Sequence, residues 1–381
     1  MDGRIFRPQT GWELDRMSAH GSMPRSAWTF PALAILLFGA ATGLELSFTP
    51  SVGGFLFAAT LLVILFGTVF AAVHHAEVIA ERIGEPYGTL LLTLAVTIIE
   101  VALIATIMLG EKPQPALARD TVFAVVMIVC NGLVGLCIFI GGLRYREQDF
   151  QVSGANLYLS MLFVLSTITL IMPNYTLTAP GPIYSAAQLG FVDLVTLMLY
   201  GVFLYTQTIR HSDYFIKGGD GAATETSSLS NRMLALSIAL LLISLLAVVL
   251  LAKKFSVVVD VVTAMIGAPP AFAGVLVAIL ILLPEGVTAF AAARNNDLQK
   301  SINLALGSSL ATIGLTIPAV GLATYVLDKE LVLGLDGQGM VLLLLTFFLS
   351  ILTFGTGRTN ILFGLVHMVV FAVFVFMVFV P

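Results

Sequence analysis

Eleven long apolar runs dominate this chain of 381 residues and limit its possible folds more than any other feature. A run of about 20 apolar residues is long enough to cross the hydrocarbon core of a bilayer as one helix. Only helices and closed barrels satisfy their backbone groups inside lipid. We therefore predict an all-α polytopic membrane protein with about 11 transmembrane helices, at approximately 28–48, 54–82, 87–110, 121–143, 155–173, 188–208, 233–267, 270–293, 299–325, 338–356 and 359–380.

The composition supports a bilayer as the main partner. Charged residues make up 10% of the chain, whereas a soluble protein carries about 25%. The Lys and Arg residues form no cluster, so we expect no nucleic-acid partner. The two cysteines, Cys130 and Cys137, lie about 10 Å apart along one predicted helix, which is too far for a disulfide.

The positions of Lys and Arg predict how the helices are oriented. With the amino terminus inside, 13 of the 18 basic residues lie in inner segments. Because cytoplasmic loops retain positive charge, the sequence predicts a cytoplasmic amino terminus and, with an odd number of spans, a carboxyl terminus outside. The first apolar run is interpreted as a retained helix rather than a signal peptide.

The two halves of the chain repeat one another weakly. Glu77 precedes Gly84 by seven residues, Asp260 precedes Gly267 by seven, and each glycine opens a Gly-x-Pro turn. Each half would contain five helices, so the second enters the membrane in the opposite sense, as in secondary transporters with a midplane site. The predicted segments are a cytoplasmic tail (1–27), an extra first transmembrane helix (28–53), a first repeat (54–208), a cytoplasmic linker (209–232) and a second repeat (233–381).

Two glutamates, Glu100 and Glu285, occupy matching places near the centre of an apolar run in each half. A charged side chain at that depth costs about 2.5–3.5 kcal/mol on insertion scales, so it is usually functional. Two carboxylates that repel each other when ionised are neutralised by a divalent cation or by protons. A cation and protons would then compete for the same charge, as an obligatory exchanger requires.

Polar residues near these glutamates are further candidates for ion-binding or proton-coupling. Thr93 and Thr97 lie one and two turns before Glu100 on one helix face. Pro284 precedes Glu285 and removes a helical hydrogen bond, which leaves a carbonyl free for a hard cation such as Ca²⁺. Other readings stay open, because membrane threonines also bond their own i−4 carbonyls and a proline also simply kinks a helix.

The remaining candidates lie on neighbouring helices. Asn131 is expected at mid-membrane depth. Ser308 and Ser309 lie in a stretch of small and polar residues, which could equally serve close packing between helices. Glu77 and Asp260 would lie near opposite membrane faces as vestibule acids, or as ordinary solvated acids. Three further polar features have no assigned role: Asp193, His367, and the face shared by His74, Glu77 and Glu81.

Two motifs resemble a known family. The segments GEPYGTLLLTLAVTIIEVALI and PEGVTAFAAARNNDLQKSINLALGSSLATIGLTIPAV are similar to those of the ChaA-type bacterial calcium/proton antiporters, within the cation/calcium exchanger superfamily. The resemblance covers both repeats. It implies a multi-pass protein of the inner membrane that exports Ca²⁺, with Na⁺ or K⁺ as alternatives, in exchange for H⁺ by alternating access. By this resemblance, the two essential acids of the family correspond to Glu100 and Glu285. The superfamily's paired long helices, which slide during alternating access, correspond to the helices that bear Glu77 and Asp260.

The chain departs from the superfamily at one position in each half. Many members carry Gly-Asn-Ala-x-Glu before the essential acid, whereas Thr97 and Leu282 stand here where the asparagine would be. The missing amides favour the alternative of monovalent Na⁺(K⁺)/H⁺ exchange.

Two other classes of function remain as alternatives. One is an intramembrane metalloenzyme using His74, Glu77 and Glu81, and the other is a cation channel. No P-loop pattern suggests a primary pump. As an exchanger the protein would not be an enzyme and would need no cofactor, because Ca²⁺ and H⁺ are cargo; its partners would be the bilayer and small inorganic cations, with a homo-oligomer left open.

Overall fold

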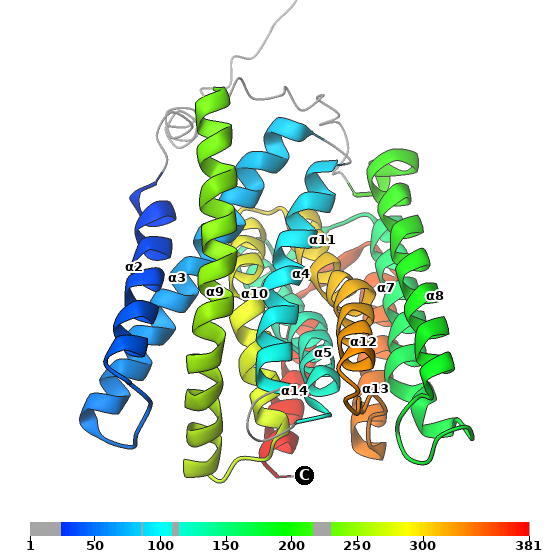
Figure 1. The fold of residues 1–381 in the computed structure, drawn as a ribbon. Helices are drawn as coiled ribbons and strands as arrows, with labels where there is room; N and C mark the ends of the chain where they lie inside the picture. Colours follow the sequence, from blue (N-terminus) through cyan, green and yellow to red (C-terminus); the bar gives the residue numbers. More distant parts are fainter. Residues whose placement is uncertain (1–23, 85–86, 109–113, 216–229, 381) are drawn as a thin grey trace, which may run out of the picture.

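The computed structural model describes residues 24–84, 87–108, 114–215 and 230–380. In these residues eleven helical segments are long and apolar enough to cross a membrane, which confirms the predicted number and class. The segments pack side by side as a helical bundle (Figure 1). Most of the predicted tail and of the predicted linker lies outside the described residues, although the first helix already begins at Arg25 rather than at 28.

The first half of the chain supplies six of the spanning segments. Helix α5 (Leu117–Met127) continues through a π-helical turn, η1 (Ile128–Leu133), into α6 (Val134–Tyr145). Short π and 3₁₀ turns also end two others: η2 (Thr167–Ile171) and η3 (Met172–Tyr175) follow α7, and η4 (Thr206–Arg210) and η5 (Ser212–Phe215) follow α8. The other helices are α2 (Arg25–Gly43), α3 (Val52–Ile83), α4 (Tyr87–Met108), α7 (Val152–Ser166) and α8 (Ala186–Tyr205).

The second half supplies the other five segments. Helix α11 (Leu298–Ala311) continues through the π-helical turn η6 (Thr312–Thr316) into α12 (Ile317–Val326). The remaining helices are α9 (Asn231–Met265), α10 (Ala271–Arg294), α13 (Gly337–Phe354) and α14 (Ile361–Phe379).

The structure repeats the inverted pattern seen in the sequence. The two longest helices, α3 with 32 residues and α9 with 35, begin the two repeats and pack against each other. Gly84 and Gly267, which open the two turns, both have a positive φ, 76° and 63°, a conformation that glycine adopts without steric cost. The π-helical turns η1 and η6 fall in the corresponding helix of each repeat.

The two ends of the bundle differ in their connections. We call the end where α8 finishes and α9 begins the linker end, and the other, where α14 finishes, the opposite end (Figure 1). At the linker end the strands β1 (Glu147–Asp149) and β2 (Arg358–Asn360) pair antiparallel. Within the described ranges this ribbon is the exception to an all-helical fold. Helix α6 ends before it, at Arg146, which has a φ of 67°.

The outer surface of the bundle suits lipid. Large apolar side chains lie exposed on several helices, among them Leu242, Phe348 and Leu362. Extensive exposed apolar surface in a soluble monomer would mark a contact site, whereas in a bilayer it faces the hydrocarbon. Polar side chains gather between the helices instead.

Candidate ion-binding site

The polar stripe of α4 leads to a buried carboxyl. Thr97 is 7% exposed and Glu100 is 1% exposed. The Thr97 hydroxyl donates to the Thr93 carbonyl over 2.9 Å, and the Thr93 hydroxyl donates to the Thr89 carbonyl over 2.9 Å. These back-bonds use the hydroxyl protons but leave oxygen lone pairs available to a cation. Both threonines therefore remain suitable as neutral oxygen ligands.

The other repeat supplies a hydrogen bond to one of the two carboxyl oxygens of Glu100. Its Oε2 accepts a hydrogen bond of 3.0 Å from the Thr312 hydroxyl in η6. Its Oε1 is buried and has no hydrogen-bond partner. An unpartnered carboxylate oxygen is costly inside a protein, so the site is prepared for a cation or a proton at that atom.

Glu285 projects from α10 at the proline-containing turn. Its Oε2 is also buried without a hydrogen-bond partner. Pro284 lies inside the helix, and the hydroxyl of Thr288 donates to its carbonyl over 3.1 Å. Because proline has no N–H, the carbonyl four residues earlier, at Leu280, loses its usual helical donor.

One cavity of about 290 Å³ brings the two glutamates together. Both repeats line it, and the charges of Glu100 and Glu285 interact across it. The predicted residues Thr93, Thr97 and Ser308 also line it. The cavity extends toward the linker end, where its lining includes Gln207, Lys300 and Asn303.

A mixed set of charges marks the linker end of this cavity. Glu77 of α3 is exposed, and its charge interacts with that of Glu285 and with that of Lys300. A cation entering from this end therefore meets Glu77 and Lys300 before the buried glutamates. Glu77 was predicted as a vestibule acid near one membrane face, whereas Lys300 was not predicted.

Other lining residues were also missed by the sequence analysis. Lys300, Asn303 and Thr312 line the cavity from the same helical segment as Ser308, residues 298–316. Thr312 lies one turn after Ser308 and Lys300 about two turns before it, so the helical period would have found both, whereas Asn303, five residues before Ser308, lies on a different side of the helix. Tyr200 comes from α8 and Gln207, seven residues later, from its η4 extension, and no motif in the sequence indicates that this segment faces the cavity.

Besides Pro284 and Glu77, which are described above, three predicted candidates do not line the cavity. Ser309 is fully buried beside it, and its hydroxyl has no hydrogen-bond partner. Asp260 accepts a 3.0 Å hydrogen bond from Gln114 and lies toward the opposite end, as its inverted position predicts. Asn131, the third, belongs to a separate polar network. The proposed roles of all three at the ion site remain predictions.

The Asn131 network joins η1 to α13 and α14. The amide of Asn131 donates to the Thr346 hydroxyl over 2.8 Å, and its carbonyl oxygen lies 3.1 Å from His367 Nδ1. The other ring nitrogen of His367 lies 2.9 Å from the Thr353 hydroxyl. His367, which had no predicted partner, is thus fully hydrogen-bonded. The network fixes the π-helical turn that packs against α10 beside Glu285.

The structure does not support a metal site on the face of α3 that carries His74, Glu77 and Glu81. Among the residues that the structure describes, His, Cys, Asp and Glu side chains form no group of three or more that could hold a metal ion. His75, next to His74, instead hydrogen-bonds the Ala27 carbonyl of α2 over 2.9 Å.

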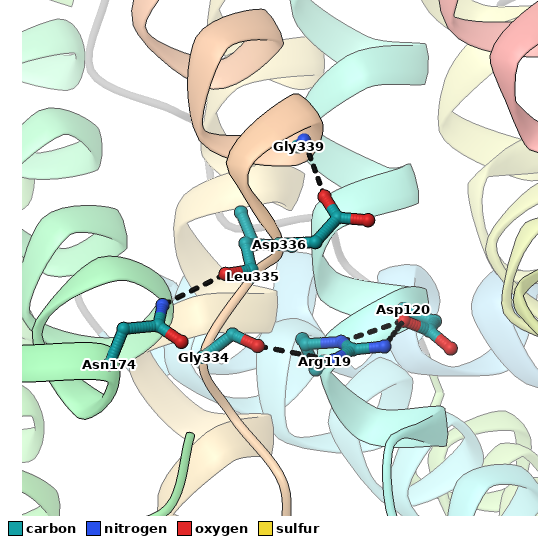
Figure 2. A network of polar contacts seen from close by, with 7 residues as sticks. All are labelled: Arg119, Asp120, Asn174, Gly334, Leu335, Asp336 and Gly339. Atoms are coloured by element: carbon teal, nitrogen blue, oxygen red, sulfur yellow. Dashed lines mark hydrogen bonds and ion pairs between the residues drawn. The ribbon is translucent and has the colours of Figure 1, made fainter. Parts of the chain in front are cut away.

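The opposite end of the bundle is closed by an extended strap, residues 331–335. Its backbone N–H groups donate to the carbonyls of Pro115, Pro182 and Leu170. Figure 2 shows Arg119 donating to the Gly334 carbonyl over 3.1 Å and pairing with Asp120, and Asn174 donating to the Leu335 carbonyl over 2.9 Å. Leu333 is fully buried in this strap.

This fold and this cavity together define a multi-pass membrane protein in which two glutamates from opposite repeats share an internal cavity that extends toward one end. Comparison with known families gives the assignment: the family model described as "Sodium/calcium exchanger protein" matches residues 51–209 and 236–380. The chain belongs to this exchanger family, which confirms the predicted superfamily.

Named relatives and solved structures agree with the assignment. The chain is 47% identical over 319 residues to the protein y4hA of Sinorhizobium fredii, and 37% identical over 322 residues to the sodium-potassium/proton antiporter ChaA of Escherichia coli. Each alignment covers 84% of this chain and 87% of the relative. The fold is similar to that of native YfkE (TM-score 0.72, 17% identity, 93% of this chain and 100% of that one). It also resembles the H⁺/Ca²⁺ exchanger CAX (TM-score 0.67, 14% identity, 96% and 89%).

Proposed function

We propose that this protein is a secondary antiporter that exports Ca²⁺, or Na⁺ or K⁺, in exchange for H⁺, with Glu100 and Glu285 as the shared binding groups. One observation carries the proposal: two membrane-embedded carboxyls from opposite repeats share a cavity, and each has a buried oxygen without a hydrogen-bond partner. Either a cation or protons would provide partners for these oxygens, but a cation and protons cannot occupy them at the same time.

The steps of exchange follow from electrostatics. With the site empty, the two carboxylates repel one another. A cation entering from the linker end neutralises them and takes neutral oxygens from Thr93, Thr97 and Ser308, which line the same cavity. After the cavity opens toward the opposite end, protons displace the cation from both carboxyls. The return of the protonated site completes the cycle without an uncompensated charge in the membrane.

The membrane is proposed to be the bacterial inner membrane, with the linker end in the cytoplasm. The positive-inside pattern supports this orientation. In the conformation described here, the cation cavity would then face the cytoplasm. No enzymatic step and no cofactor are part of this proposal, and a homo-oligomer remains a prediction.

Monovalent exchange is the second candidate, and three observations favour it. The amides that line the cavity, Gln207 and Asn303, lie near its linker end instead of three residues before each glutamate. Lys300 adds a positive charge at the same end, and that charge opposes a divalent ion twice as strongly as a monovalent one. The 37% identical relative is named as a sodium-potassium/proton antiporter.

Cation-driven proton movement in everted vesicles tests the proposal. Ca²⁺, Na⁺ and K⁺ are added separately to vesicles that hold a pH gradient, with wild type, Glu100→Gln and Glu285→Gln. The proposal expects at least one cation to collapse the gradient with wild type and with neither variant. Asp149→Asn, at an exposed ion pair with Arg358, is the matched control and should act as wild type.

Either of two results overturns the proposal. One is a gradient that no cation changes, and the other is normal exchange by both glutamine variants. Continued cation flux without any counter-movement of protons would indicate the channel alternative.

A further inference from the structure

Asp193 is a third membrane-embedded carboxyl, and the ion cavity does not use it. It lies on α8, seven residues after the helix begins. Its side chain is half-buried, and its Oδ1 is buried without a hydrogen-bond partner. A lone carboxyl at this depth is costly when ionised and is by default a functional candidate.

In the described part of the chain, the elements that pack mainly against α8 contain no charge that could neutralise Asp193. Helix α8 packs against α7, η6 and α12. These three elements contain no Asp, Glu, Lys, Arg or His, and their ionisable side chains are Tyr158 and Tyr325. On α8 itself and its η4 extension the other ionisable groups are Tyr200, Tyr205 and Arg210. Asp193 therefore has to carry a proton to be neutral in this environment.

Two glycines bring the α12 side of the site close to α8. A Cβ atom on Gly321 would lie 2.5 Å from Asp193 Oδ2, and one on Gly314 would lie 2.7 Å from the Tyr200 ring. The two contacts are seven residues apart on each helix, and the residue numbers rise along one helix where they fall along the other. The helices are thus antiparallel neighbours, and Tyr200 at one contact also lines the ion cavity.

Two unpartnered hydroxyls lie within this helix contact. Thr196, three residues after Asp193, is fully buried, and so is Thr316; neither hydroxyl has a hydrogen-bond partner. Thr316 lies beside the Glu100 carboxyl. Because a hydroxyl both donates and accepts, such groups can pass a proton from one carboxyl to another.

The opposite end of this contact is open to a second cavity. A cavity of about 250 Å³ lies between the start of α8 and the end of α12, lined by Leu189 and Thr324. Each of these is within four residues, about one helical turn, of Asp193 or Gly321. The same cavity is lined by the charged side chains of Asp328, Lys329 and Glu330, so water can reach it from the opposite end.

We propose that Asp193 is a proton site that supplies Glu100 from the opposite end, by way of Thr196 and Thr316, separately from the cation cavity. The Asp193 carboxyl gives its proton through the hydroxyls to the Glu100 carboxylate, and a proton from water in the second cavity replaces it. In the conformation described, Asp193 Oδ1 and the Thr196 hydroxyl lack hydrogen-bond partners, although Thr316 lies beside the Glu100 carboxyl. The line is therefore interrupted, and protons do not leak while the cation cavity is open to the linker end.

The inference rests on the proposed antiport, and one pair of assays separates the two. Proteoliposomes are used to measure cation-driven proton movement, and separately the exchange of radioactive Ca²⁺ or Na⁺ for the same ion at equal pH. Self-exchange needs the cation site but no proton delivery. The variants are Asp193→Asn, Asp193→Glu and Thr196→Val, with Asp149→Asn as control and Glu100→Gln as the variant that lacks the cation site.

The expected result is a loss confined to proton coupling. Asp193→Asn and Thr196→Val should slow proton-coupled exchange by about tenfold or more and leave self-exchange as in wild type, while Asp193→Glu keeps most coupling. Normal coupling in both variants, or an equal fall in both assays, overturns the inference. If Asp193→Asn does not fold, the isosteric Thr196→Val decides. Wild type that is inactive in both assays would instead refute the antiport itself.

Discussion

The two glutamates of the cavity are held differently, although they occupy corresponding places. Glu100 has a hydroxyl donor from the opposite repeat, Thr312, at one of its oxygens. For Glu285 the structure provides a proline-interrupted helix and an oxygen without a partner. Glu100 is therefore the better stabilised of the two as a carboxylate, and each still has one oxygen available to an ion.

Replacing Thr312 with valine should weaken cation binding. A hydrogen bond to a charged group contributes about 1.5–3 kcal/mol, and its loss disfavours ionised Glu100 relative to the protonated form. Apparent cation affinity at fixed pH should then fall about tenfold or more, measured by transport at varied cation concentration. Thr106→Val is the control, because Thr106 bonds only its own helix. Equal affinities in the two variants would contradict this role for Thr312.

Asn131→Ala should decide between two roles for that residue. The structure supports a packing role, because the Asn131 side chain is satisfied by Thr346 and His367. On that account the variant loses about 1 kcal/mol of stability, seen as a lower unfolding temperature in detergent, and His367→Phe shows the same loss. A lost affinity for cations at an unchanged unfolding temperature would instead make Asn131 a ligand.

Much of the site could be predicted at the scale of single residues. Glu100, Glu285, Thr93, Thr97 and Ser308 all line one cavity, since charge at membrane depth and helical spacing are visible in the sequence. The separate location of Asn131 was not predictable. Hydropathy cannot tell which side of a fully apolar helix faces the site. The hydrogen-bond partners of Asn131 also lie more than 200 positions away in the sequence.

At the scale of elements, the strap at residues 331–335 is what closes the opposite end. Its backbone hydrogen bonds join two loops and the helical turn η2, all distant from it in sequence, and Arg119 and Asn174 hold it from two sides (Figure 2). Any opening of the site toward that end has to release these contacts. The strap is therefore the element whose movement should accompany alternating access.

Arg119→Ala should make this end open more often. Loss of one hydrogen bond of about 1 kcal/mol shifts such an equilibrium several-fold. A cysteine reporter at Leu333→Cys, buried in the strap, should react faster with a membrane-impermeant maleimide when Arg119 is absent. The two native cysteines are buried and give little background. Unchanged labelling would mean that the strap is not held by Arg119.

The elements themselves differ in how far the sequence predicts them. Long apolar runs located all eleven spanning segments among the described residues, because burial in lipid demands a helix whatever the local propensity. The strap, the β1–β2 ribbon and the π-helical turns η1 and η6 were not predicted. Each depends on hydrogen bonds or packing with distant parts of the chain, for which no local pattern exists.

For the whole molecule, the central feature is access from one end. The ion cavity extends from the glutamates to the linker end, while the strap covers the opposite end. With the orientation that the basic residues predict, the described conformation faces the cytoplasm. A transporter of this kind has to pass through a second conformation in which these two features are exchanged.

Neighbouring serines provide a matched test of this access. Ser308 lines the cavity, whereas Ser309 is fully buried outside it. Ser308→Cys should be labelled by an impermeant thiol reagent added to everted vesicles, and bound cation should slow the labelling. Ser309→Cys should remain unlabelled. Labelling of Ser308→Cys only in vesicles of the opposite orientation would reverse the assigned topology.

The most direct test of the account is proton release when a cation binds to the purified protein. Ca²⁺ or Na⁺ is added in weakly buffered detergent solution, and a pH indicator records the protons released by wild type, Glu100→Gln, Glu285→Gln and the control Asp149→Asn. The account predicts release from wild type and the control, and a smaller release or none from each glutamine variant. Cation binding without proton release, or the same release from all four proteins, would contradict competition at the two glutamates.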